Sequence, residues 1–186
     1  MKAAQTLLVF GLFALSMVQT SYGWCHQEDD RLDTLFIRLH DTSDPAEARN
    51  IEGLIWKIWL ESGDNELDTV MRQGIIAMNT RDFQGALEAF DSIVKIAPDF
   101  AEGWNKRATL YWLMGELQKS IDDIERTLAL EPRHFGALSG LGMIRKEQER
   151  PSDAIQAYER ALAIYPTMPN AAKQIKILED QLGKSI

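Results

Sequence analysis

Apolar residues recur every three or four positions along most of this chain, which is the pattern of amphipathic helices buried along one face. No stretch alternates strictly between apolar and polar residues, as a half-buried β-strand would. Between residues 67 and 168 the helical pattern also repeats, because a shift of 34 residues brings like residues into the same columns. The best-formed copy, residues 101–134, predicts two short helices joined by a tight turn and ended by a proline. We therefore predict an all-α protein built from repeats.

Three copies of this unit follow one another without insertion, at residues 67–100, 101–134 and 135–168. Small residues fall mid-way through both helices of each copy, where they let antiparallel helices approach closely. A proline then stops each second helix, because its ring excludes the preceding helical turn. The small residues are Gly74, Ala108 and Gly142 in the first helices and Ala86, Ser120 and Ala154 in the second; the bulky residues beside them are Val70, Trp104, Leu138, Phe90, Ile124 and Tyr158; the prolines are Pro98, Pro132 and Pro166.

This arrangement resembles the tetratricopeptide repeat, and the resemblance covers residues 67–168 in register. It implies a right-handed α-solenoid of three helix pairs. It also implies a binding scaffold, since stacked first helices in this family line a concave surface that receives an extended peptide or a helix of another protein.

Two columns depart from the family pattern. A leucine is common where the second copy has Arg107, and a large aromatic or aliphatic residue is usual where the third copy has Arg145. We expect Arg107 to lay its stem along Trp104 and Tyr111 while its head reaches a carboxylate. Arg145 is expected to be less buried than its counterparts.

The resemblance also implies which residues face the groove. Family members that grip a C-terminal carboxylate use lysine, asparagine and arginine there, but the corresponding positions here include Met71, Ile75, Gly136 and Gly140. That clamp is therefore absent apart from Lys106, and methionines make one end of the groove apolar and adaptable. The predicted groove residues are Met71, Arg72, Ile75 and Met78 in the first copy, Asn105, Lys106, Thr109 and Trp112 in the second, and Ser139, Met143 and Lys146 in the third. Trp104, by contrast, is predicted to be a core residue. The alternative is that some groove residues pack against N-terminal helices and bind nothing.

Helices are predicted on both sides of the repeats. Residues 24–66 predict a helical pair, with Asp44 and Pro45 as the start signal of its second helix. That helix contains LIWKIWL, residues 54–60, and is apolar nearly all round, so we expect it to be buried from two directions, shielding the first-repeat end of the stack. A ligand-stacking role for its two tryptophans is the alternative. Residues 169–186 predict a closing helix over the last repeat.

Residues 1–23 have the layout of a secretory signal peptide. Lys2 is followed by an apolar run of twelve residues, Leu7–Val18, and then by small residues at Ser21 and Gly23. The run is shorter than the roughly 20 residues of a membrane-spanning helix, although a retained anchor stays open as an alternative. We expect cleavage before Trp24 and a periplasmic mature protein that does not insert into the membrane.

The remaining sequence offers little for chemistry. The single cysteine, Cys25, permits no intramolecular disulfide, which suits a bacterial periplasm, and Cys25–His26 is only a weak metal or redox motif. The other histidines, His40 and His134, are not at metal-ligand spacing, and no glycine-rich phosphate loop is present. We predict no catalytic residue, no metal site and no cofactor, and hence no enzyme.

A net charge of -8 argues against nucleic acid as a partner, because such a surface repels phosphate backbones. The leading hypothesis is an exported scaffold that binds a peptide or helix of a cell-envelope protein in its groove. The alternative is a structural accessory subunit that self-associates, or that docks into an envelope complex through its convex face or N-terminal helices.

Overall fold

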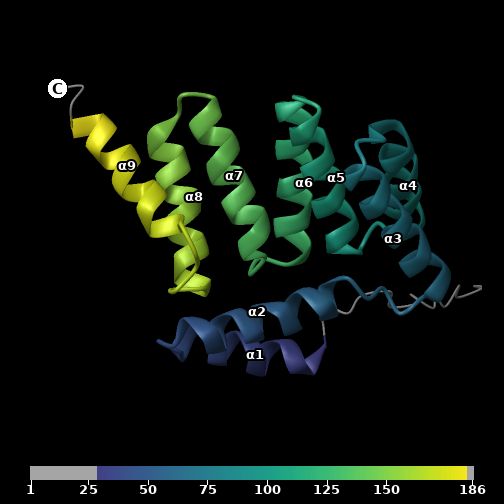
Figure 1. Cartoon of the computed structure of the whole chain (residues 1–186), viewed down its shortest axis with the longest axis horizontal. Coiled ribbons are helices and arrows are strands. Elements are labelled where there is room, and N and C mark those ends of the chain that lie inside the picture. Colours follow the sequence, from purple (N-terminus) through teal and green to yellow (C-terminus); the bar gives the residue numbers. More distant parts are fainter. Residues whose placement is uncertain (1–28, 184–186) are drawn as a thin grey trace, which may run out of the picture.

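The computed structural model describes residues 29–183, and within this range the chain is nine helices without a strand (Figure 1). The predicted all-α repeat fold is confirmed. The predicted signal segment, together with Cys25 and His26, lies outside the described residues. The helices are α1 (Asp30–Asp41), α2 (Pro45–Trp59), α3 (Asn65–Asn79), α4 (Phe83–Ile96), α5 (Ala101–Leu113), α6 (Leu117–Leu130), α7 (Phe135–Glu147), α8 (Pro151–Ile164) and α9 (Ala171–Gly183).

Helices α3 to α8 form three antiparallel pairs that stack in chain order, with α9 packed against α8 at the far end (Figure 1). Each predicted copy of the repeat holds one pair, although α3 begins two residues before residue 67. The small-residue columns bring the paired helices into contact. A Cβ atom on Gly74 would lie 2.6 Å from the ring of Phe90, and one on Gly142 would lie 2.8 Å from the ring of Tyr158.

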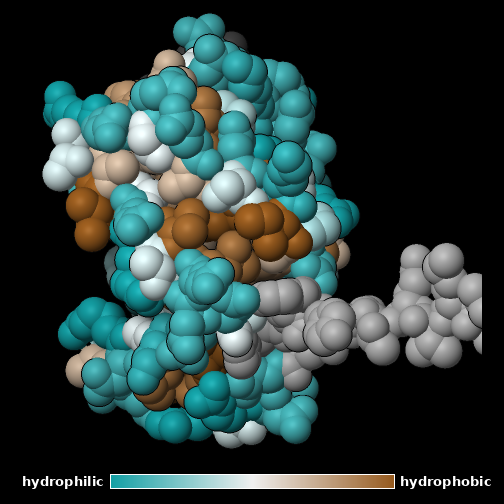
Figure 2. Space-filling model, turned by 90° about the vertical axis from the view of Figure 1, so that its right-hand side faces the viewer, coloured by the Kyte–Doolittle hydropathy of each residue, from teal (hydrophilic) through white to brown (hydrophobic). Residues whose placement is uncertain are grey.

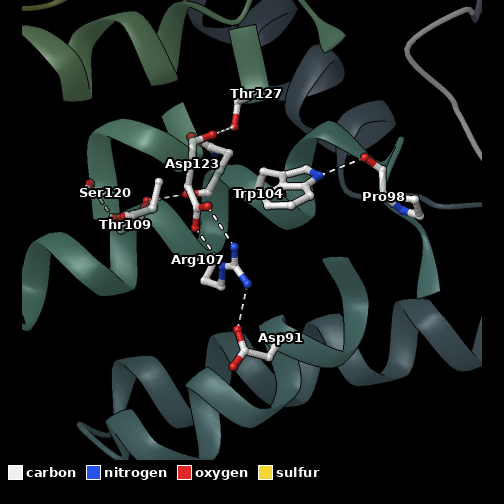
Figure 3. Close-up of polar contacts among 10 residues, drawn as sticks. Asp91, Pro98, Trp104, Arg107, Thr109, Ser120, Asp123 and Thr127 are labelled. Carbon is white, nitrogen blue, oxygen red and sulfur yellow. Dashed lines mark hydrogen bonds and ion pairs between the residues drawn. The ribbon is translucent and has the colours of Figure 1, made fainter. Parts of the chain in front are cut away.

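Arg107 fastens α5 to the helices on both sides of it (Figure 3). Its guanidinium donates to both carboxylate oxygens of Asp123 on α6, at 2.7 and 2.8 Å, and to Asp91 on α4 at 2.8 Å. The same group lies 4.9 Å from the ring centroid of Trp104 and 5.6 Å from that of Tyr111. Because only 16% of the Arg107 side chain is exposed, solvent ions screen these pairs less than they would a surface pair. The predicted arrangement of Arg107 is confirmed.

Trp104 is not the core residue that its column predicts. It is only partly buried, and its indole Nε1 donates to the carbonyl oxygen of Pro98 at 2.9 Å (Figure 3). The guanidinium of Arg126 lies on the same ring, 5.8 Å from its centroid. An indole has a polar N–H that needs a partner, and here the partner is the loop that ends the first repeat. Trp104 therefore joins two repeats near the surface.

The N-terminal pair lies across the ends of the repeat helices. In Figure 1, α1 and α2 run beneath α5 to α8, along the edge where the loops before α7 and after α8 meet. Their buried residues form one hydrophobic cluster with Phe135 at the start of α7 and Tyr165 just after α8. The Tyr165 hydroxyl donates to Glu52 at 3.2 Å, and Arg133 pairs with Asp33 at 2.6 Å. The predicted position, over the end of the first repeat, is wrong.

The outward face of the first repeat has no such cover, and it mixes polar residues with exposed apolar ones. Leu110 and Ile144 pack into the core cluster of the repeat before them. Their counterpart in α3 is Ile76, which is 62% exposed, and the residue in the Arg107 column is the exposed Gln73. Figure 2 views this end of the molecule, where hydrophilic residues surround a band of hydrophobic ones. Terminal repeats of such stacks need a polar outer face, and here α2 buries its apolar surface elsewhere.

The close approach of α7 and α8 yields a stability prediction. Gly142→Ala places a methyl group against the Tyr158 ring and should cost about 1–3 kcal/mol of unfolding free energy through overpacking. The matched control is Gly53→Ala on α2, where nothing lies within 4 Å of the added Cβ atom. That variant should gain up to about 1 kcal/mol from helix propensity. Chemical denaturation of both variants checks this, and equal stabilities would refute the described packing.

Candidate partner-binding groove

Helices α5 and α7, the first helices of the second and third repeats, enclose a cavity of about 300 Å³. Its floor is apolar, formed by Ala108, Ile124 and Ile144, whereas Thr109 and Ser139 provide hydroxyl groups. Gly140 lies where a side chain would otherwise narrow it, since a Cβ atom there would meet nothing closer than Ile124 at 3.6 Å, whereas a Cβ atom on Gly136 would meet the Trp56 ring at 2.7 Å. We call this cavity the apolar pocket.

Trp112 forms one wall of the apolar pocket. Its indole Nε1 donates to Glu147 Oε1 on α7 at 2.8 Å, so the ring is held between the two helices. The residue is partly buried, which leaves part of the ring available to a bound chain. A rigid aromatic wall beside the flexible side chain of Met143 combines a fixed surface with an adaptable one.

A second cavity, of about 520 Å³, lies on the other side of α7 and shares Ser139 and Met143 with the first. It is bounded by α7, by Tyr158 of α8 and by the start of α9, and it is more polar than the apolar pocket. We call it the polar pocket. The two pockets together form a groove that runs from α5 across α7 to α9.

The predicted groove residues divide between this groove and other places. Those on its surface are Asn105, Thr109, Trp112, Ser139 and Met143 in the apolar pocket and Lys146 in the polar pocket. The other predicted residues lie elsewhere. A separate hollow beside α2 is lined by Met71, Arg72 and Ile75. Met78 packs on the core of the first repeat, and the ammonium of Lys106 pairs with Glu102.

Met71 is a core residue, only 1% exposed, so its prediction as a groove residue is wrong. The cause is α2, whose Leu60 packs on the same cluster and whose Trp56 lines the hollow in front of it. The prediction also missed the pocket floor and the α9 end. Gly140 of α7 was a usable signal for the pocket, because a position without a side chain that faces a groove leaves it open.

A buried charged cluster lies at the base of α5 and α7. Glu102 is 1% exposed, and its Oε1 lies 2.9 Å from the ammonium of Lys106. Its Oε2 accepts from the Asn105 amide at 3.0 Å and lies 2.9 Å from Nε2 of the fully buried His134. The Ala137 N–H donates to Nδ1 of the same ring, so the ring proton is on Nε2 and points at Glu102.

The cluster also holds α2. The ring of Trp59 stacks on His134 with centroids 4.1 Å apart and planes 9° apart. Trp56 lies edge-on to the same imidazole at 5.4 Å, beneath the Lys106 ammonium. The two tryptophans therefore pack against the repeat stack, on the polar and aromatic cluster around His134.

The electrostatic balance of Glu102 favours its charged form. Burial alone would raise the pKa of its carboxyl, but the Lys106 ammonium and the hydrogen bond from His134 outweigh it and hold the pKa below its ordinary value of 4.5. Lys106 is thereby committed to an internal partner and is not available as a free cation of the groove.

Among residues 29–183, no three His, Cys, Asp or Glu side chains are grouped so that they could hold a metal ion. None of the helices in this range is long and apolar enough to cross a membrane.

Comparison with known proteins gives a consistent result. Sequence models of the tetratricopeptide repeat match residues 99–167 and 71–126. A TPR repeat-containing protein of Rhizobium etli is 39% identical over 153 residues, which cover 82% of this chain and 75% of that protein. The small glutamine-rich tetratricopeptide repeat-containing protein 2 of Saccharomyces cerevisiae is 27% identical over 68% of this chain but only 36% of its own length.

Solved structures share the fold. The Sgt2 TPR domain from Aspergillus fumigatus superposes with a TM-score of 0.61 at 21% identity, over 66% of this chain and 82% of that domain. The first TPR of Spaghetti (RPAP3), bound to the HSP90 peptide SRMEEVD, superposes with a TM-score of 0.61 at 18% identity, over 64% of this chain and 96% of that one. MamA superposes with a TM-score of 0.60 at 22% identity, over 76% of this chain and 86% of that one.

The buried carboxylate makes stability depend on pH. The pKa of Glu102 is lower in the folded state than in the unfolded one, so its contribution is complete above about pH 4.5 and is lost as the pH falls through the folded-state value. Glu102→Gln should lose about 2 kcal/mol of unfolding free energy at neutral pH, and its unfolding free energy should fall less than that of wild type as the pH is lowered. The exposed Glu125→Gln is the charge-matched control and should behave as wild type. Denaturation midpoints measured from neutral to acidic pH check this, and parallel profiles for wild type and Glu102→Gln would contradict it.

Proposed function

The chain belongs to the tetratricopeptide repeat family, and from this we propose that it is an exported scaffold that binds a peptide or helical segment of a cell-envelope protein. Domains of this family are protein-interaction scaffolds, and two of the structural relatives carry peptides from other proteins, an HSP90 peptide in one and Hsp70 in a complex with yeast Sti1 in the other. The contact surface in this chain is the groove formed by the apolar and polar pockets.

The apolar pocket is the observation that carries the proposal. About 300 Å³ of space between two helices, with a floor of small and aliphatic residues, can receive one bulky side chain of a bound segment. Trp112 supplies the kind of aromatic wall that dominates the binding energy of protein interfaces. The first repeat adds little to this surface, because Met71 is buried and the hollow beside it is separate and has α2 as its other side.

Binding is favoured over catalysis by the chemistry of this surface. The hydroxyl groups of Thr109 and Ser139 have no histidine among the residues that line the pocket, so no general base is at hand to activate them. His134, at the base of the groove, is fully buried and occupied at both ring nitrogens.

A filled pocket tests the proposal. Gly140→Leu should occupy the apolar pocket without damage to the fold, because a Cβ atom there makes only ordinary contacts. A photocrosslinking residue introduced at the exposed Thr109 should capture the partner in living cells, and Gly140→Leu in the same chain should reduce this capture at least about tenfold, the loss of a hot-spot contact.

The control for the filled pocket is Gly53→Leu, an exposed helix position with open space around it. It should leave the crosslinked products from Thr109 unchanged. The assignment of the groove would be abandoned if Gly140→Leu also left them unchanged while unfolding at the same denaturant concentration as wild type.

Export rests on the layout of residues 1–23, which combine a basic start, an apolar run and small residues before the proposed cut. We expect the protein recovered from the periplasmic fraction to begin at Trp24, as read from its intact mass. Recovery of the chain with Met1 in the cytosolic fraction would contradict export. Recovery of an uncut chain with the membranes would favour the retained anchor.

A further inference from the structure

The polar pocket holds hydrogen-bond donors without acidic partners. Lys146 projects from α7, and its ammonium is 2.8 Å from the amide oxygen of Gln174 on α9, a neutral group. The neighbouring carboxylate, Glu147, also lines the polar pocket, but its Oε1 accepts the indole N–H of Trp112. In the described part of the chain, the ammonium of Lys146 is paired with the Gln174 amide oxygen and forms no ion pair with a carboxylate.

Tyr158 provides a second donor. The residue is only 2% exposed and lines the polar pocket, and the far end of its ring lies across Gly142 of α7. Its hydroxyl forms no hydrogen bond within residues 29–183, and it is not among the unpaired polar atoms that are sealed from solvent, so it can reach a bound group. Burial raises the pKa of this phenol, so the hydroxyl stays protonated and able to donate at neutral pH.

The first turn of α9 is a third feature of the polar pocket that favours an anion. Pro169, Asn170 and Ala171 border the polar pocket, and this turn contains no acidic residue. The N–H groups at the start of a helix are unpaired and carry a partial positive charge. A bound anion accepts hydrogen bonds from these groups and balances that charge. An ammonium, a buried phenol and a helix start thus converge on one cavity.

We propose that the polar pocket receives the side-chain carboxylate of an aspartate or glutamate in the bound segment, while the apolar pocket takes a bulky apolar side chain of the same segment. This inference rests on the proposed function and specifies its partner. The two pockets share Ser139 and Met143, so one continuous segment crossing α7 can fill both. At about 520 Å³ the polar pocket has room for a whole acidic side chain with its backbone continuing past it.

Peptide selection on the purified protein tests the inference. One library displays random peptides between fixed flanks, so that only side chains supply carboxylates, and the other displays random peptides with free C-termini. Selection against wild type should enrich, in the flanked library, sequences that combine a bulky apolar residue with aspartate or glutamate. A selected peptide is then compared with its analogue in which the acid is replaced by its amide.

Wild type should bind the amide analogue about tenfold more weakly, the loss of one charge-assisted hydrogen bond. Lys146→Met should lose most of the preference for the acid, because the ammonium that would pair with the carboxylate is gone. Tyr158→Phe keeps the ring against Gly142 and should show a smaller preference for the acid than wild type. Lys176→Met removes an exposed positive charge on α9 that does not line the polar pocket, and it should keep the full preference.

The outcomes separate this inference from the proposed function. Apolar peptides that bind, are blocked by Gly140→Leu and show no acid preference would overturn the inference and leave the groove intact. An acid preference confined to free C-termini, or one that Lys146→Met leaves undiminished, would also overturn it. If neither library yields peptides that Gly140→Leu blocks, both the inference and the proposed function fail.

Discussion

The carboxylate of Glu102 is the group on which the arrangement of this protein depends. A buried charge is tolerated only when it is paired, and here the pairing partners come from two repeats: Lys106 and Asn105 on its own helix, and His134 on the segment before α7. The imidazole is in turn fixed by the Ala137 N–H and by the stacked ring of Trp59. One carboxylate therefore sets the spacing of α5 and α7 and the position at which α2 crosses them.

The composition of the groove follows from that cluster. Lys106, the one clamp-like cation of the second repeat, is held by Glu102, and α2 forms one side of the hollow in front of the first repeat. The open surface is displaced towards the C-terminal half of the stack, where Gly140 of α7 leaves space and Lys146 pairs with a neutral amide. An internal ion pair thus decides which end of the concave face remains available to another protein.

The 34-residue period predicted the contacts that residues make within one repeat and with the adjacent repeats. It predicted the three helix pairs, the contact of Gly142 with Tyr158 and the position of Arg107, because those partners lie at fixed offsets in a repeat. The period did not predict the contacts of α1 and α2, which cross the ends of the repeat helices. Asp68 stands one period before Glu102, but the column of His134 holds Phe100 and Met168, and Trp59 precedes the repeats. The pairing of Glu102 and Trp59 with His134 joins distant segments. The outward face of α3 did carry a signal, since polar Gln73 replaces the residue that inner repeats bury, and this column argued against a cover at that end.

The crossing of α1 and α2 changes how the molecule should come apart. A simple stack contacts only its nearest neighbours, so it can fray from either end one unit at a time. Here the earliest described helices pack on His134 of the second repeat and on Phe135 and Tyr165 of the third, so these two repeats are joined by contacts of long sequence separation. Those units gain a shared cooperativity at the expense of slower assembly. The pair α3–α4 and the helix α9 lie outside this cluster, so their amide hydrogens should exchange sooner than those of the central block.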